Sequence, residues 1–389
     1  MMNKWMSCKV ILFVVFLFFL VSHPFRVWAS VHGVCSNCHT MHNSQGGSVV
    51  NSNGTEGNLL KSNCVGCHSS DSAQTIKVIG GDIHVPIVYN TVEPNYPATP
   101  TASGSNNALA GGNFYWVEHN GDQYGHNVIS HTDGILTEAP GRNQGCANSC
   151  HYSLYTWSYS GGDWSYKGDG GPGNGCVSCH TPAHHKRGST TPIADAEDGW
   201  FRFLAQRHGS SNDLNIKGLE DSDWQQSVSP TDHNEYWDYY VSGPNGVYGI
   251  SRFCAACHGD FHSTRYGPVN GGFQSGAWFA APWFRHPAGI YLPSTGETSK
   301  YNTDGSGPDG VPGSYNPVAP VGRQNIDSIS SPSATVAVGS SGDMVMCLSC
   351  HRAHGSPYPD MLRWDYLNTC EAGQSNENCG CFICHTTKN

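Results

Sequence analysis

The chain has 389 residues, a length that would hold two or three ordinary domains. Its 47 glycines and 22 prolines instead favour many turns and few long helices or strands. The formal net charge of −10 at pH 7 argues against nucleic acid as a partner.

Residues 1–29 have the features of a secretory signal. Lys4 and Lys9 give a positive start, residues 10–21 form an apolar run that is short for a bilayer span, and Ala29 ends a small-residue cleavage site. Cys8 precedes the apolar run, which argues against a lipid anchor. We therefore expect residues 30–389 to form one exported domain with no membrane span and a formal charge of −13.

Seven segments of the predicted mature chain place a histidine directly after a pair of closely spaced cysteines. This is the attachment signature of c-type haem, in which both thiols bond to the porphyrin and the imidazole binds the iron on its proximal side. Zinc sites also use paired cysteines but do not require that histidine. The attachment cysteines are Cys35 and Cys38, Cys64 and Cys67, Cys146 and Cys150, Cys176 and Cys179, Cys254 and Cys257, Cys347 and Cys350, and Cys381 and Cys384, and the proximal histidines are His39, His68, His151, His180, His258, His351 and His385.

Seven porphyrins would supply the apolar faces around which this chain folds. We expect a multihaem cytochrome c, made mostly of irregular loops with short helices at the motifs and a few short hairpins. Hairpins are predicted at residues 114–121, where Asn120-Gly121 follows an aromatic run, and at residues 155–166 around Gly161-Gly162. Residues 193–208 favour a helix, and residues 271–342 show no periodicity.

Cys370 and Cys379 belong to no attachment motif. Export to an oxidising compartment favours a disulfide between them, which would stabilise the fold by about 2–3 kcal/mol. The alternative is that Cys379 competes with Cys381 for the last haem.

The histidine count indicates the axial ligands. Of 21 histidines, His23 lies in the predicted signal and seven are proximal, so 13 remain for seven distal positions, whereas the predicted mature chain keeps only Met41, Met344, Met346 and Met361. Bis-histidine iron is therefore expected throughout. Such iron has both axial positions closed and carries electrons rather than binding a small substrate.

Several remaining histidines follow their own attachment motif within a few residues. They are His42, His184 or His185, His262 and His354. Each is too close in sequence to reach the far face of its own haem, so each is expected to bind the iron of a neighbouring haem. One short segment would then bind two irons and fix their spacing, which predicts a continuous chain of haems.

Six segments together resemble the outer-surface multihaem cytochromes that polymerise into extracellular filaments, most strongly the hexahaem type. They read CSNCHTMHNS at residues 35–44, YGHNVIS at 124–130, CAACHGDFHS at 254–263, RHPAG at 285–289, CHRAHG within 347–355 and CFICHTTK at 381–388. The segments occur in the same order and cover most of the predicted mature chain. The motif at Cys146 has no counterpart in the hexahaem pattern, and we interpret it as an added seventh haem.

The resemblance and the motif positions imply particular distal ligands. Within one subunit they are His84, His126, His184 or His185, His262, His286 and His354. His42 is implied to bind a haem of the adjacent subunit, near that subunit's C-terminal end, at the haem of His351 or His385. The distal ligand of the seventh haem stays open among His119, His131, His185, His208 and His233.

The predicted function is long-range electron transfer outside the cell, through seven bis-histidine haems in a head-to-tail homopolymer, with no catalytic residues. Other redox proteins or extracellular electron acceptors would be the further partners. The first alternative is a periplasmic or cell-surface electron shuttle that carries the same haems without polymerising. The second is a multihaem oxyanion reductase, which would require an open iron, and the stretched Cys146 motif is the one place for it.

Overall fold

The computed structural model describes the chain in several stretches. These are residues 31, 33–50, 59–62, 64–96, 108–128, 176, 179–180, 182–185, 200–204, 216–240, 247–255, 258, 286, 288–302, 313–373 and 378–386. The predicted signal, the 155–166 hairpin and the attachment motif at Cys146 lie outside them. Among the described residues, no helix is long and apolar enough to cross a membrane.

Regular structure comes in short pieces, as predicted for a multihaem cytochrome. The α-helices are α2 (Cys64–His68), α3 (Tyr115–Asn120), α4 (Ile250–Ala255), α5 (Tyr366–Thr369) and α6 (Gly380–Cys384). The 3-10 helices are η1 (Cys35–Asn37), η2 (Asp122–Tyr124), η4 (Phe201–Phe203), η8 (Glu297–Lys300), η9 (Ile326–Ser328), η10 (Cys347–Ser349) and η11 (Pro359–Met361). The predicted fold class is confirmed by this loop-dominated architecture.

The strands form small sheets. They are β1 (Ser44–Gln45), β2 (Ser48–Val49), β3 (Ser69–Ser70), β4 (Ile76–Ile79), β5 (Ile83–Pro86), β6 (Tyr89–Asn90), β7 (Gly218–Leu219), β8 (Glu235–Tyr240), β9 (Val247–Gly249), β10 (Ile290–Tyr291), β11 (Gly322–Arg323) and β12 (Met344–Val345). The largest sheet has the order β10-β12-β11-β8-β7, with β9 added on β8. Its strands lead directly into two attachment motifs, because β9 continues into α4 and β12 into η10.

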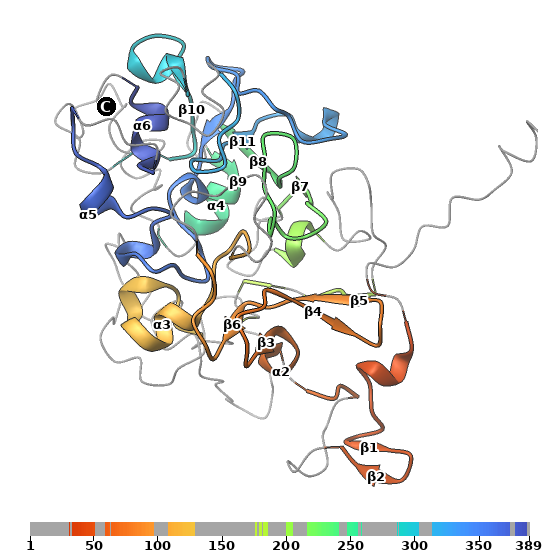
Figure 1. Cartoon of the computed structure of the whole chain (residues 1–389). Coiled ribbons are helices and arrows are strands. Elements are labelled where there is room, and N and C mark those ends of the chain that lie inside the picture. The colour runs from red at the N-terminus through yellow and green to blue at the C-terminus, as the bar shows by residue number, and fades with distance from the viewer. Residues whose placement is uncertain are drawn as a thin grey trace, which may run out of the picture.

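Two clusters of buried apolar side chains lie beside the attachment motifs. One is built on Tyr301, Tyr315, Trp364 and Ile383, with Cys350, Cys381 and Cys384 packed against it. The other includes Phe201, Ile216, Tyr236, Phe253 and Met346. Figure 1 shows β1 and β2 at one end of the molecule and α5 and α6 at the opposite end. The first and last attachment motifs, which adjoin these elements, therefore lie far apart.

A buried network of charges joins the strands of the largest sheet. Arg323 donates from Nε to Glu235 Oε2 at 2.7 Å and pairs with Asp343 through Nη1. His233, which is fully buried, donates from Nδ1 to the Ser229 carbonyl at 3.0 Å and has Nε2 3.3 Å from Glu235 Oε1. Since Asp343 lies just before β12, the network fixes the strand that enters the Cys347 motif.

The hairpin predicted at residues 114–121 is wrong. Residues Tyr115–Asn120 form α3, and Gly121 ends that helix with φ 108° while its N–H donates to the Val117 carbonyl. Trp116 and Val117 are buried against the rest of the molecule. Asn-Gly therefore terminates a helix here, because packing of one helical face outweighs the turn preference of the dipeptide.

The helix predicted at residues 193–208 is also wrong where the structure describes it. Only η4 occurs, and Arg202 has φ 48°. The Arg202 carbonyl accepts from His180 Nδ1, and the Arg202 N–H donates to Glu220 Oε1 at 2.7 Å. Because these backbone groups have partners elsewhere, they are not available to a helical ladder. The hairpin of β4 and β5 was not predicted, although Gly80-Gly81 marked its turn.

Candidate haem sites

The attachment motifs that the structure describes form one helical turn each. The histidine N–H donates to the carbonyl of the first cysteine in the motifs that start at Cys35, Cys176, Cys254, Cys347 and Cys381, over distances of 2.8–3.0 Å. In such a turn, positions i, i+3 and i+4 lie on the same side. Both thiols and the imidazole therefore point toward one face, as covalent attachment and axial ligation of one porphyrin require.

Five of the motif histidines face a second histidine ring. The pairs and their centroid distances are His39 with His185 at 5.8 Å, His68 with His184 at 6.1 Å, His180 with His354 at 6.1 Å, His258 with His126 at 6.0 Å, and His385 with His286 at 6.0 Å. In each pair, one ring belongs to an attachment motif and the other comes from a different part of the chain. These centroid distances exceed the roughly 3.5–4 Å of rings in face-to-face van der Waals contact, which leaves room for an atom between the rings.

Iron with two axial imidazoles fits this spacing. Two metal–nitrogen bonds of about 2 Å each, together with the half-widths of two imidazole rings, separate the ring centres by about 6 Å. Backbone carbonyls also orient several of the rings, because Nδ1 of His68, His126 and His180 lies 2.8, 2.7 and 2.8 Å from a carbonyl oxygen. Donation from Nδ1 makes Nε2 the nitrogen that would ligate a metal, which is the usual arrangement around histidine ligands.

Burial favours the uncharged imidazole that metal binding requires. It lowers the pKa of His126 to about 4 and that of His354 to about 3, with the neighbouring histidines adding to both shifts. Both rings are therefore neutral at pH 7, and each keeps a nitrogen lone pair that can bind a metal. The sequence left a choice between His184 and His185; the structure brings both rings to motif histidines, each at a different site.

His351 differs from the five paired motif histidines. Its Nδ1 lies 2.7 Å from the Asp360 carbonyl, as at the other sites. Within the described stretches, no second imidazole ring faces it. His42 lies exposed beside the first motif, and His84 is exposed on β5 without a facing motif histidine among the described residues. His151, His208 and His262 lie outside the described residues.

Two of the open candidates for the seventh haem have other contacts. His233 is fully buried, stacks on Tyr315 with a centroid distance of 3.6 Å, and meets Glu235 through Nε2. His119 stacks on Tyr115 at 3.9 Å, and its Nδ1 lies 2.8 Å from the Tyr115 carbonyl. Both ring nitrogens of His233 have a polar neighbour, since Nδ1 lies against the Ser229 carbonyl and Nε2 against Glu235. In His119 the contact described is made by Nδ1.

Attachment cysteines of different motifs lie next to each other. A hydrogen bond with Cys176 lowers the pKa of the Cys64 thiol to about 6. A hydrogen bond between Cys254 and Cys347 raises the pKa of Cys254, and burial adds to that rise. Porphyrins held by neighbouring thiols have neighbouring edges, so these contacts order the sites in space, which the sequence could not do.

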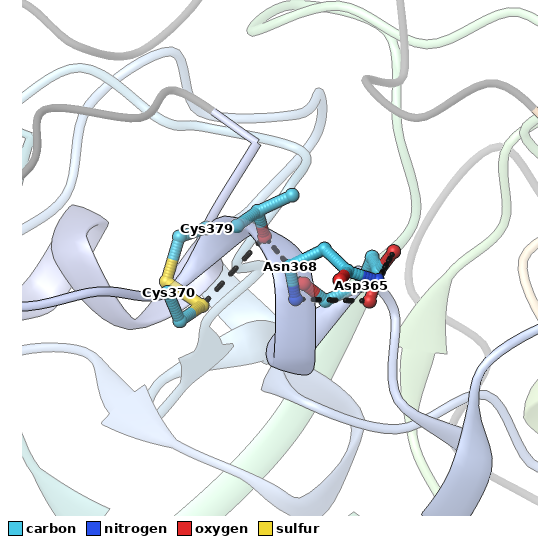
Figure 2. Close-up of a disulfide and its surroundings, with 5 residues drawn as sticks. Asp365, Asn368, Cys370 and Cys379 are labelled. Carbon is cyan, nitrogen blue, oxygen red and sulfur yellow. Dashed lines mark hydrogen bonds between the residues drawn. A yellow bond between two sulfur atoms is a disulfide. The ribbon is translucent and has the colours of Figure 1, made fainter.

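The disulfide predicted between Cys370 and Cys379 is present (Figure 2). It closes the segment between α5 and α6, and α5 is capped at its N-terminus by Asp365, whose side chain accepts from the Asn368 N–H. Cys379 is fully buried. The disulfide therefore adjoins the last attachment motif directly.

Motifs that present two thiols and an imidazole, together with paired imidazoles at the spacing of one iron, define the class of multihaem c-type cytochromes. A family model described as "Doubled CXXCH motif" matches residues 338–389. The chain is 27% identical over 375 residues to C-type cytochrome OmcS of Geobacter sulfurreducens, covering 85% of this chain and 78% of that protein. This similarity confirms the resemblance that the motifs indicated.

Two solved structures are also similar. One is the Outer Membrane Cytochrome S filament from Geobacter sulfurreducens, with a TM-score of 0.48, 21% identity, and 88% of this chain and 86% of that chain covered. The other is a cryo-EM structure of the OmcS nanowires from the same organism, with a TM-score of 0.49, 20% identity and 92% of both chains covered.

Proposed function

We propose that this protein transfers electrons over long distances outside the cell, through seven c-type haems per chain in a filament of head-to-tail subunits. Each haem would be held by the two cysteines and the proximal histidine of its motif. The distal ligands within one chain would be His185, His184, His354, His126 and His286, for the haems of His39, His68, His180, His258 and His385. When bound, each haem iron exchanges one electron between its ferric and ferrous forms.

The observation that carries this proposal is the set of five facing histidine pairs. A second imidazole on the far side of the iron leaves no open axial position, so substrate cannot bind there. The chain's own residues hold this closed geometry rigidly, because backbone carbonyls fix the orientation of several rings. Electron transfer, and not catalysis, is the function that this arrangement supports.

Continuity of the electron path is supported by shared segments. His184 and His185 are adjacent residues that face the motif histidines of two different sites. His354 follows the Cys347 motif by a few residues and faces His180 of another motif. The neighbouring thiols of Cys64 with Cys176, and of Cys254 with Cys347, link further sites. These links support a continuous chain through the haems of the motifs at Cys35, Cys64, Cys176, Cys254 and Cys347.

The seventh haem, at Cys146, Cys150 and His151, rests on the sequence alone. The histidine after Cys150 preserves the ligand position, and the one extra residue lengthens only the loop between the thiols. His119, His131 and His208 are its remaining distal candidates in our proposal, since His233 is enclosed by other contacts. Because five irons have facing pairs and that of His351 is assigned to His42, His84 and His262 are left unassigned in our proposal.

Polymerisation is supported by the position of His42. It is exposed beside the first motif, whereas His351, near the other end of the chain, has no facing imidazole among the described residues. We assign His42 to the haem of His351 in the adjacent subunit, because His286 already faces His385. Repeated head-to-tail contact that does not close into a ring gives a filament.

The names of similar proteins support an extracellular location and assembly into filaments. The solved structures describe an outer-membrane cytochrome filament and nanowires. By analogy we place this chain outside the cell, reached through the predicted secretory signal, with other redox proteins or extracellular acceptors exchanging electrons with the filament.

Replacing His286 with Met tests one assigned pair. We expect one haem, that of His385, to change its spectrum and to shift to a higher potential, because a thioether or a vacant position stabilises ferrous iron relative to a second imidazole. Spectroelectrochemical titration measures this shift, with the other haems of the same molecule as the internal reference. An unchanged titration curve and spectrum would remove His286 from the ligands.

A further inference from the structure

Three cysteine sulfurs gather at the last attachment motif. Those of Cys370, Cys379 and Cys381 all lie within 4.8 Å of one another. Cys381 is the first cysteine of the motif, and Cys379 precedes it by two residues. The sulfurs of Cys379 and Cys381 therefore both lie where the proposed last haem would be attached. That haem needs only one of them in addition to Cys384.

The distance in sequence between Cys379 and Cys384 resembles that of another attachment motif in this chain. With Cys384 and His385 it makes a longer version of the attachment signature, with four residues between the cysteines. The motif at Cys146 and Cys150 already has three residues between its cysteines, instead of two. A free Cys379 thiol would therefore be a competitor for attachment, and the sequence alone does not say which sulfur is used.

The chemistry of attachment separates the two sulfurs. When a thioether forms, the S–H of a cysteine adds across a vinyl double bond of the porphyrin, so that a carbon–sulfur bond forms, the hydrogen goes to the neighbouring carbon, and no net electrons are exchanged with a third partner. A disulfide sulfur carries no hydrogen and cannot react in this way. Formation of the disulfide itself transfers two electrons and two protons from Cys370 and Cys379 to a thiol oxidant of the exporting compartment.

Packing keeps Cys379 in the disulfide. The residue is fully buried, and Gly380 next to it lies so close to Trp364 that a Cβ atom would come within 2.2 Å of the indole. The Cys381 thiol is close enough to the two disulfide sulfurs, all three lying within 4.8 Å of one another, to attack the disulfide by thiol exchange. Once Cys381 carries a thioether, that attack is no longer possible.

We propose that the Cys370–Cys379 disulfide selects the cysteine that binds the last haem, by removing Cys379 from attachment and leaving Cys381 to react. The inference rests on the proposed haem at Cys381, Cys384 and His385. It assigns the disulfide a role in maturation that is separate from its contribution to stability.

Two matched variants of the full chain test the selection. In Cys381→Ser the disulfide remains, and in Cys370→Ser with Cys381→Ser it is absent. Both variants are expressed under conditions that attach haem. Their thiols are alkylated before and after reduction, and the proteins are digested with trypsin. Mass spectrometry then analyses the peptide between Arg363 and Lys388. A second comparison keeps Cys381. It sets the single variant Cys370→Ser against the double variant Cys370→Ser with Cys379→Ser.

The expected results differ between the members of each comparison. Cys381→Ser should carry haem through Cys384 alone, with two further thiols alkylated only after reduction. Cys370→Ser with Cys381→Ser should form a second thioether, through Cys379. In the second comparison, Cys370→Ser should yield a fraction of haem bonded to Cys379 and a free Cys381, whereas the variant without Cys379 should attach haem only at Cys381 and Cys384.

Other outcomes overturn the inference. Attachment through Cys379 in Cys381→Ser would show that the disulfide does not exclude it. A free, alkylatable Cys379 in both variants that lack Cys370 but keep Cys379 would show that Cys379 does not compete. Wild-type protein with no haem on this peptide would refute the proposed last haem site itself, together with the inference, and is recognised by the mass of the unmodified peptide.

Discussion

His42→Ala should leave every haem attached but prevent the formation of long filaments. Attachment uses only the cysteines of the motifs, so the haem content per chain should not change. The imidazole of His42 is exposed beside the first motif, and our proposal gives it the distal position of the His351 haem in the next subunit. Loss of that ligand removes the iron–imidazole coordination bond that would join the subunits and changes the coordination of one iron per chain.

Electron microscopy measures the filament length, and the optical spectrum reports the altered iron. Met41→Ala is the matched control, because Met41 is 70% exposed next to His42 and its removal leaves the imidazole in place. Filaments of normal length from His42→Ala, with every iron still low-spin, would show that His42 does not bind across the interface.

Arg323→Met should destabilise the fold by about 3–5 kcal/mol, because it leaves two buried carboxylates without their shared cation. Glu235 is fully buried, Asp343 is nearly so, and Arg323 contacts both. The substitution keeps most of the side-chain length, so the loss reports the charge more than the packing. Since Asp343 precedes β12 and the Cys347 motif, the haem at that motif should also change its spectrum.

Equilibrium unfolding in guanidinium, followed by tryptophan fluorescence, measures the free energy of unfolding. Lys217→Met is the matched control, since Lys217 pairs with Asp327 at 3.1 Å on the surface, where the side chains are 30% and 64% exposed. Its effect should stay within about 1 kcal/mol. Equal effects from the two substitutions would contradict a structural role for the buried network.

The local geometry of the attachment sites was predictable from the sequence because it depends on neighbouring residues. The spacing of Cys35, Cys38 and His39 dictates a single helical turn, and the structure has that turn. The surplus of histidines over methionines predicted bis-histidine iron, and the five facing pairs fit it. The disulfide between Cys370 and Cys379 followed from the two cysteines left over.

Long-range contacts were not predictable in the same way. No local pattern tells that His126 faces His258, or that the carbonyl of Arg202 orients His180. The same contacts explain the wrong predictions, because the backbone of Arg202 is held by His180 and Glu220 instead of a helix. The carbonyls that orient the rings carry no sequence signal, since every residue has one.

The most direct test of the account is low-temperature electron paramagnetic resonance of the fully oxidised, purified protein, with the spins counted per chain. Bis-histidine ligation at every site predicts seven low-spin ferric centres per chain in assembled filaments and no high-spin signal. A substantial high-spin signal from assembled filaments would mean that an iron keeps an open axial position. That result would contradict the proposal of a closed electron conductor and favour an enzyme.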